Sequence, residues 1–413
     1  MARLGISVYP EHDSMENIKK YVDLASKYGY SRIFSCLLSI EGKNKEQLIE
    51  EFRGLNDFAH ERDMEVFLDI APNVLNNLGV EWNDLQFFKD MHADGIRLDQ
   101  GFTGMEEALM TTNPQGLKIE LNASNLDGYI DNVCMHHPDR AHLTTCHNFY
   151  PMRYSGLSLD HFRKCNKAIK KNNLPIAAFI GSNHPDAFGP WPVKEGLVTL
   201  EDHRDLPLDA QARLLIAEGD VDDILISNCY PTEEELAAVA KLQPGILNLK
   251  PVLEKELTEV ERKILYEHPH FVRGDMSEYS ARSTMPRVTF AKESIAPANN
   301  REIKRGDLVI FNDGYGRYKG ELHVVLKDMP ADDRKNVIGH FRLKNFIYWM
   351  PLNHGHLSKS SNRLSIKFNQ MFDRSFTAGV QTVRSSIGQF FGICGQRTVE
   401  EERRWFYDLK EAT

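Results

Sequence analysis

The chain has 413 residues, enough for two domains of ordinary size, and its 41% hydrophobic content is sufficient for a sizeable core. A formal net charge of −9 argues against partners such as nucleic acid or an anionic membrane surface. The sequence has no signal-peptide pattern and no run of about 18 apolar residues that could span a bilayer. Its six cysteines form no C-x-x-C pair, so we expect reduced thiols in a cytoplasmic protein.

Short apolar runs alternate with segments of helical periodicity along the first part of the chain. These runs predict strands at residues 4–9, 32–38, 65–70, 95–99, 117–122, 141–146, 175–180 and 222–227. Ser14 can cap the first helix, and Thr232 with Glu235 forms a capping-box pattern before the last. Eight strand–helix units predict a (β/α)₈ barrel, an α/β fold, over residues 1–243. The rival, an open doubly wound sheet, usually has a Gly-rich turn after its first strand, which is missing here.

A change of pattern after the barrel predicts a second, smaller domain. Residues 244–267 read as a connector with a helical signal, and residues 268–339 read as β-rich. Strand-like pieces occur at 287–291, 307–312 and 321–326, separated by stretches rich in Gly, Asn and Asp.

In barrels of this kind the catalytic groups lie at the carboxyl ends of the strands. Asp69, Asp99 and Glu120 occupy such positions, and we take them as the candidate catalytic acids. Asp99 could instead cap the next helix, and Asp69 could cap a loop. Glu120 is harder to explain structurally, because a carboxylate inside a barrel without a role costs several kcal/mol of desolvation.

Further polar residues surround the same strand ends and are candidates for substrate binding. Those of the barrel are Glu11, Asn122, His147, Asn148, Tyr150, Arg153, Gly181, Ser182, Asn183, Ser227 and Asn228. Acids together with His and Arg suit either glycosidic bond cleavage by two carboxylates or the binding of a divalent metal. No fixed His spacing supports a metal, and the strand ends carry no Lys for a Schiff base, so no cofactor is expected.

Several motifs together resemble a bacterial family, once labelled outer surface proteins, that is associated with 6-phospho-N-acetylmuramidase activity. In the barrel they are "GISVYPEH", "FLDIAP", "GIRLDQGF", "IELNAS", "HNFYPMRYSGLS" and "FIGSN". "VRGDMSEYSARST" and "GDLVIFNDGYGRYKGEL" resemble the second domain of the family, which has a cyclophilin-like β-barrel fold. The resemblance implies a cytoplasmic glycosidase of cell-wall recycling that cleaves the β-1,4 bond between N-acetylmuramic acid 6-phosphate and N-acetylglucosamine.

A phosphorylated amino-sugar disaccharide carries two anionic groups, and each needs binding residues that can be sought in the sequence. Its phosphate needs N–H donors, which barrels often supply after strands 7 and 8, here at residues 181–183 and 227–228. Its lactyl carboxylate needs a cation, which Arg153, or Arg282 or Arg317 of the second domain, could supply. Two alternatives remain open: a metal-dependent sugar-phosphate isomerase or epimerase, and a carbohydrate-binding protein without catalysis.

The chain from His340 onward lacks a clean strand or helix period. Read one nucleotide out of register with free choice of synonymous codons, residues 340–362 can encode "FPPEEFYLLDAIEPWSFIKIIE". That peptide has a coherent amphipathic pattern and resembles the end of the family's second domain. We therefore predict that residues 340–413 are a frameshifted tail with little regular structure and that the second domain lacks its final strand.

Overall fold

Eight parallel strands form a closed barrel in the first part of the chain. The computed structural model describes residues 2–37, 45–242, 246–249, 251–275, 277–341, 355–356, 359–360 and 363–367. The barrel strands, each paired with the next and β1 also with β8, are β1 (Arg3–Val8), β2 (Arg32–Cys36), β3 (Glu65–Ile70), β4 (Gly95–Leu98), β5 (Lys118–Asn122), β6 (Leu143–Cys146), β7 (Ile176–Ile180) and β8 (Asp223–Ile226). The predicted (β/α)₈ fold is confirmed.

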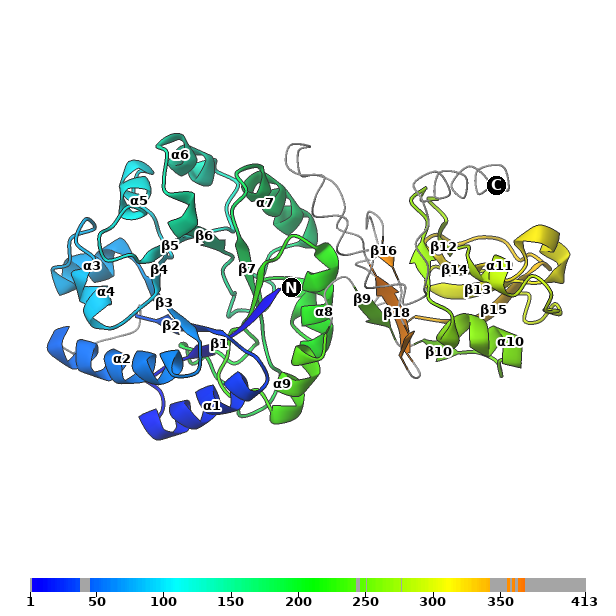
Figure 1. Cartoon of the computed structure of the whole chain (residues 1–413), viewed down its shortest axis with the longest axis horizontal. Coiled ribbons are helices and arrows are strands. Elements are labelled where there is room, and N and C mark those ends of the chain that lie inside the picture. The colour runs from blue at the N-terminus through cyan, green and yellow to red at the C-terminus, as the bar shows by residue number, and fades with distance from the viewer. Residues whose placement is uncertain are drawn as a thin grey trace, which may run out of the picture. The chain divides into compact units, whose positions relative to one another are not determined.

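Helices surround this ring of strands, as Figure 1 shows. They are α1 (Met15–Lys27), α2 (Lys45–His60), α3 (Pro72–Leu78), α4 (Gln86–Asp90), α5 (Met105–Met110), α6 (Tyr129–Met135), α7 (Leu159–Lys171), α8 (Leu208–Glu218) and α9 (Glu233–Ala240), with short 3₁₀ turns η1 (Arg140–His142) and η2 (Glu201–His203). Ser14 caps α1, and Thr232 and Glu235 form the predicted capping box of α9. In the described part of the chain, no helix has both the length and the apolar character needed to cross a membrane.

The barrel interior has an apolar region formed mainly by strands other than β3, β4 and β5. It contains Tyr9, Phe34, Cys36, Cys146, Ala177, Phe179, Leu225 and Cys229. Phe34 and Phe179 pack edge to face with ring centroids 5.1 Å apart. The interior side chains of β3, β4 and β5 next to this cluster include charged ones, so their charges lie in a poorly hydrated environment.

A second, antiparallel sheet follows the barrel in sequence, as predicted. Its strand order is β10 (Val252–Leu253), β15 (Lys335–His340), β13 (Asp307–Phe311), β14 (Leu322–Val325) and β12 (Ser280–Ser283). The associated helices and turns are α10 (Glu259–Arg262), the π-helical η3 (Lys263–Glu267), α11 (Pro286–Thr289) and the 3₁₀ segment η4 (Asp313–Tyr318). We call this unit the β domain; a cyclophilin-like barrel stays a prediction from the resemblance.

Two details differ from the sequence prediction. The prediction of a strand at 287–291 is wrong, because α11 covers most of that segment. Pro286 stands at the first helical position, where its fixed φ favours a helix. The segment predicted as a connector also supplies a strand of the sheet, since Val252 and Leu253 of β10 pair with His340 and Gly339. A Cβ atom at Gly339 would lie 2.4 Å from the carbonyl oxygen of Val252, so only glycine fits this close approach.

Most of the predicted tail lies outside the described residues. Within it the structure has β16 (Gly355–His356), β17 (Lys359–Ser360) and β18 (Arg363–Lys367). β16 pairs with β11 (Phe271–Val272), and β18 pairs with β9 (Ile246–Leu249). These short strands differ from the expectation of little regular structure; the frameshift itself stays a prediction.

Candidate active site at the carboxyl ends of the barrel strands

Three charged residues occupy neighbouring positions on β3, β4 and β5. Asp69 lies opposite Arg97, and Arg97 lies opposite Glu120. Successive residues of a strand point to opposite faces, and these three are 3%, 2% and 0% exposed. The strand register therefore aligns carboxylate, guanidinium and carboxylate in one buried row.

Arg97 joins two of the candidate acids. Its Nη1 atom donates to Asp69 Oδ1 at 2.5 Å and to Asp99 Oδ1 at 3.3 Å, and its Nη2 atom donates to Asn148 Oδ1. Arg97 and Asp99 are two residues apart, so alternation along β4 directs both to the same side. Because both carboxylate oxygens contact one nitrogen, they are at most about 5.8 Å from each other.

Asp69 has a strongly shifted ionisation. The pKa of Asp69 is raised to about 7: burial is the largest cause, Arg97 opposes it, and the charges of Asp99 and Glu120 add to the rise. Its side chain is 5% exposed, whereas that of Asp99 is 33% exposed. The pair thus combines a carboxyl group that can hold a proton near neutral pH with a carboxylate open to solvent, the division of roles that acid-assisted hydrolysis requires.

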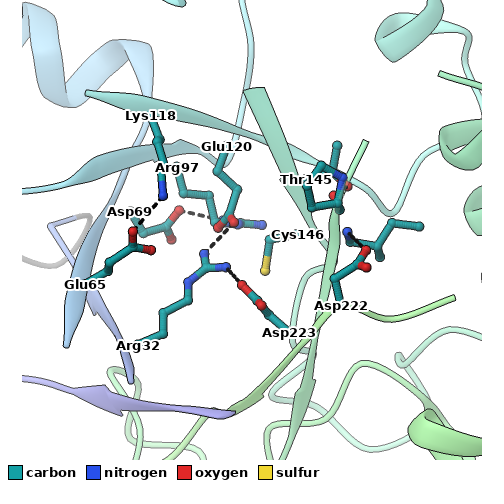
Figure 2. A network of polar contacts seen from close by, with 12 residues as sticks. Arg32, Glu65, Asp69, Arg97, Lys118, Glu120, Thr145, Cys146, Asp222 and Asp223 are labelled. Carbon is teal, nitrogen blue, oxygen red and sulfur yellow. Dashed lines mark hydrogen bonds and ion pairs between the residues drawn. The ribbon is translucent and has the colours of Figure 1, made fainter. Parts of the chain in front are cut away.

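Glu120 belongs to a separate ion-pair network inside the barrel (Figure 2). Its Oε2 atom accepts a hydrogen bond from Arg32 Nη2, and Arg32 Nη1 donates to Asp223 Oδ2 at 2.5 Å. The Arg32 guanidinium also lies 4.0 Å from the centre of the Phe67 ring. The structure therefore brings Asp69 and Asp99 together on Arg97, and it places Glu120 out of contact with solvent on a different arginine.

The polar residues around the ends of β5 and β6 are held by hydrogen bonds to neighbouring parts of the barrel. His147 is fully buried; its Nε2 atom is 2.8 Å from Asn166 Oδ1, and burial lowers its pKa to about 4, so the ring is neutral at pH 7. Asn122 donates to the backbone oxygen of Asp99 at 3.2 Å. Tyr150 is half-buried, and its backbone N–H bonds Val198 O at 3.0 Å. These hydrogen bonds fix the polar side chains at the carboxyl ends of the barrel strands. Asn148 also contacts Arg97 directly.

A cavity of about 170 Å³ lies beyond β7 and β8 and collects four predicted binding residues. They are Arg153, Ser182, Asn183 and Asn228. Lys194, from the long loop after β7, lines the same cavity and is exposed. Arg153 is held by Asp205, with nitrogen–oxygen distances of 2.9 and 3.0 Å. The cavity also contains the carboxylate of Glu195, whose Oε2 atom accepts from the backbone N–H of Arg153 at 2.7 Å. Two cations, two amides and one carboxylate leave an excess of one positive charge among these side chains, which can serve an oxyanion.

Several backbone donors predicted to bind phosphate already have partners within the fold. The N–H of Gly181 donates to Gln211 Oε1 at 2.9 Å, and that of Ser182 donates to Asn228 Oδ1 at 2.8 Å. Ser227 is fully buried, and its N–H bonds Ile180 O at 2.9 Å. If a phosphate binds in this cavity, side chains rather than these N–H groups must carry most of the interaction.

The remaining predicted residues lie elsewhere. Glu11 Oε1 is 3.9 Å from His12 Nε2 in the loop after β1. Arg282, in the β domain, pairs with Asp275, and Arg317 donates to the Tyr318 hydroxyl at 2.8 Å. Among the described residues, no group of three or more His, Cys, Asp or Glu side chains is arranged to hold a metal ion.

Sequence reasoning missed the arginines that organise the interior. Arg97 stands inside a predicted strand, whereas barrel catalytic groups are expected at the strand ends. Its spacing of two residues from Asp99 was the available signal, because that spacing places both on one face. Arg32, at the start of β2, gave no comparable signal, since its partners Glu120 and Asp223 are distant in sequence.

These features define a (β/α)₈ barrel protein with an arginine-bridged acidic site at the carboxyl ends of its strands. Residues 4–241 match the description "6-phospho-N-acetylmuramidase, N-terminal", and residues 247–347 match "6-phospho-N-acetylmuramidase, C-terminal". The chain therefore belongs to the 6-phospho-N-acetylmuramidase family. No curated protein matches it.

Two solved structures are similar over both domains. An uncharacterized Bacillus cereus protein is 41% identical with a TM-score of 0.78, covering 87% of this chain and 99% of that one. A conserved Enterococcus faecalis protein of unknown function is 25% identical with a TM-score of 0.60, covering 88% of this chain and 95% of that one. Neither description assigns an activity, so the chemistry has to be argued from the site.

Proposed function

We propose that the protein is a glycoside hydrolase that cleaves the β-1,4 bond between N-acetylmuramic acid 6-phosphate and N-acetylglucosamine. Family membership supports the substrate class. The observation that carries the chemistry is the pair of carboxyl groups, Asp69 and Asp99, held on one arginine where the barrel strands end.

In this proposal Asp69 is the general acid and Asp99 is the nucleophile. Asp69 gives its proton to the glycosidic oxygen as that bond breaks, and Asp99 forms a bond to the anomeric carbon. Asp69 then takes a proton from water, which displaces Asp99 and regenerates both groups. Retaining enzymes hold their carboxyl groups about 5–5.5 Å apart and inverting ones about 6.5–9.5 Å. The Oδ1 atoms of Asp69 and Asp99 lie at most about 5.8 Å apart, so a retaining pair is compatible with the structure and retention is the stereochemistry that we propose.

Glu120 acts as a positioning residue in this proposal. It holds Arg32 in the barrel interior, and its charge raises the pKa of Asp69. Arg153 and Lys194 bind the 6-phosphate in the cavity beyond β7 and β8, with Asn183 and Asn228 as further donors. We place the reaction in the cytoplasm, which the buried thiols of Cys134, Cys146, Cys165 and Cys229 support, since none of these four is in a disulfide.

The test is hydrolysis of the phosphorylated disaccharide by the purified full chain. Asp69→Asn and Asp99→Asn should each lower turnover about 10²–10⁴-fold. Asp160→Asn, on the exposed face of α7, is the matched control and should retain normal turnover. Full activity of both active-site variants would reject the pair. The first-formed product, followed by NMR, should keep the β configuration; an α product would reject retention.

A chelator separates this function from a metal-dependent isomerase. Two carboxyl groups need no metal, so hydrolysis should be unchanged after dialysis against EDTA. Loss of activity that Mg²⁺ or Mn²⁺ restores would contradict the two-carboxylate mechanism.

A further inference from the structure

The β domain has a cavity of its own, about 430 Å³ in volume. Its walls come from β12, β13 and β14, from α11 and η4, and from the residues before β12. The volume is within the range of small-molecule sites, and the lining combines aromatic rings with a few charged groups, as such sites do. The proposed glycosidase reaction, at the carboxyl ends of the barrel strands, involves none of the residues that line this cavity.

The charge of this lining is predominantly positive. Four cationic side chains line the cavity, and Glu321 is the one carboxylate among its described lining residues; the cations are Arg273, Arg282, Arg287 and Lys335. Arg273 and Arg282 share a single carboxylate, that of Asp275, at 2.7 and 2.8 Å. The buried Nε atom of Arg282 has no hydrogen-bond partner within the described structure. Two guanidinium groups that share one carboxylate leave one positive charge available to an anion.

Glu321 does not cancel this excess, because its charge is already engaged. Its Oε1 atom accepts from Arg287 Nη1 at 2.7 Å, and its Oε2 atom is 2.9 Å from His323 Nε2. His323 Nδ1 is 3.2 Å from Ser280 Oγ, so both carboxylate oxygens of Glu321 and both ring nitrogens of His323 have polar partners. These buried groups are engaged with one another, whereas the side chains of Arg273 and Arg282 are 45% and 29% exposed.

Aromatic rings form the rest of the wall. Phe311 stacks on Tyr315 with centroids 4.1 Å apart and on His323 at 4.2 Å. Tyr279 and Tyr318 also line the cavity, and they are 42% and 37% exposed. Cations of the protein already lie near both rings: Arg287 and Arg317 are 5.4 and 4.9 Å from the Tyr318 ring centre, and Lys327 is 5.1 Å from that of Tyr279. The exposed part of either ring can take the C–H side of a sugar ring while cations of the cavity take its charged substituent. A lone anion would make no use of these rings.

We propose that this cavity is a second ligand site, specific for a saccharide that carries a phosphate or carboxylate group. Arg273 and Arg282 bind the anionic group through the exposed parts of their guanidinium groups, and Tyr279 or Tyr318 packs against the sugar ring. The site binds but does not cleave, so it would retain a charged sugar independently of the barrel. The use of amino sugars as probes rests on the proposed function.

Calorimetric titration of the full chain tests this site without turnover. The probes are N-acetylglucosamine 6-phosphate, N-acetylmuramic acid, neutral N-acetylglucosamine and inorganic phosphate. At least one of the first two should bind at least about tenfold more tightly than the last two, because only they combine ring and anion. Arg273→Gln and Tyr318→Ala should each weaken that binding about tenfold. Both side chains are substantially exposed, so the variants should fold.

Two controls locate the binding. Arg262→Gln removes an exposed arginine of α10 that does not line the cavity, and it should leave the affinity unchanged. Arg153→Ala alters the barrel cavity alone and should also leave it unchanged. Binding that responds to Arg153→Ala and not to Arg273→Gln belongs to the barrel and overturns the proposal. Equal affinity for inorganic phosphate overturns the saccharide specificity. Since no cleavage is measured, a protein without hydrolase activity could still pass this test.

Discussion

Asp69 and Arg97 lie opposite each other on β3 and β4, and their side chains meet at 2.5 Å in the barrel interior. Neither group has contact with much water, since they are 3% and 2% exposed. A buried pair of this kind is sensitive to the loss of either partner, because the remaining charge cannot be solvated. The first three predictions follow from this environment.

The pH dependence of hydrolysis should follow the proton on Asp69. The general acid must be protonated, and its pKa is raised to about 7, so kcat/KM should fall as pH rises through about 7. Below that pH the acid keeps its proton, and this group causes no loss. Asp69→Asn should remove this alkaline limb, and Asp160→Asn should leave it in place. A profile that stays flat from pH 6 to pH 9 would contradict the assignment of Asp69.

Arg97→Met should shift that alkaline limb to higher pH. The arginine lowers the pKa of Asp69, so its removal lets the carboxyl group hold its proton more strongly. The free energy of unfolding should also fall by about 3–5 kcal/mol, because a buried charge partner is lost. Arg53→Met, at an exposed arginine of α2, should cost under about 0.5 kcal/mol. Urea titration and a pH–rate profile measure both effects.

Glu120→Gln should shift the limb in the opposite direction. The charge of Glu120 raises the pKa of Asp69, so the neutral amide should lower it and move the limb to lower pH. The free energy of unfolding should fall by about 3–5 kcal/mol, because Arg32 loses one of its two carboxylate partners. Turnover per folded molecule should fall less than in Asp69→Asn. A loss as large as in that variant would make Glu120 a catalytic residue; Glu61→Gln, 72% exposed, is the control.

Selectivity for the phosphate should depend on Arg153 and Lys194. Replacing either by Ala should raise KM for the phosphorylated disaccharide about tenfold and leave kcat nearly unchanged, because the contact is remote from the reacting bond. The unphosphorylated disaccharide should be a poor substrate, and the same variants should not raise its KM further. Lys171→Ala, at the end of α7, serves as the control. An equal rise in KM for both disaccharides would show that the phosphate binds elsewhere.

The reading frame near codon 340 is directly testable. If the tail is translated out of frame, resequencing should reveal one missing or additional base at that point. A version that continues from residue 340 with the alternative peptide should be more soluble and should melt at a higher temperature, because the β domain regains a strand. An intact frame in independent reads, with no gain from the alternative peptide, would reject the idea.

The barrel was predictable because short apolar runs and helical patterns alternate along it, and each predicted strand overlaps the observed one. Asp69 and Asp99 could be nominated from strand ends alone. Their bridge through Arg97 could not, because it depends on which strands are neighbours and in which register. The partners of the Gly181 and Ser182 N–H groups could not be predicted for a related reason: Gln211 and Asn228 are far away in sequence.

The second domain was less predictable. Val288 and Thr289 favour strands by propensity, but Pro286 starts a helix before them. β10 and β12 are too short for a periodic signal to stand out. Pairing across long sequence separations, such as β10 with β15, is information that local patterns do not contain.

The pairing of β10 with β15 determines where the chain can be divided. Val252 and Leu253 form the edge of the β-domain sheet, although they precede α10 and the rest of that unit. A fragment beginning at residue 268 would leave the backbone groups of β15 without this neighbour and open to another chain. Expression of the β domain alone therefore has to begin upstream of Val252, and a protease cut between β10 and α10 would nick the sheet rather than separate two independent domains.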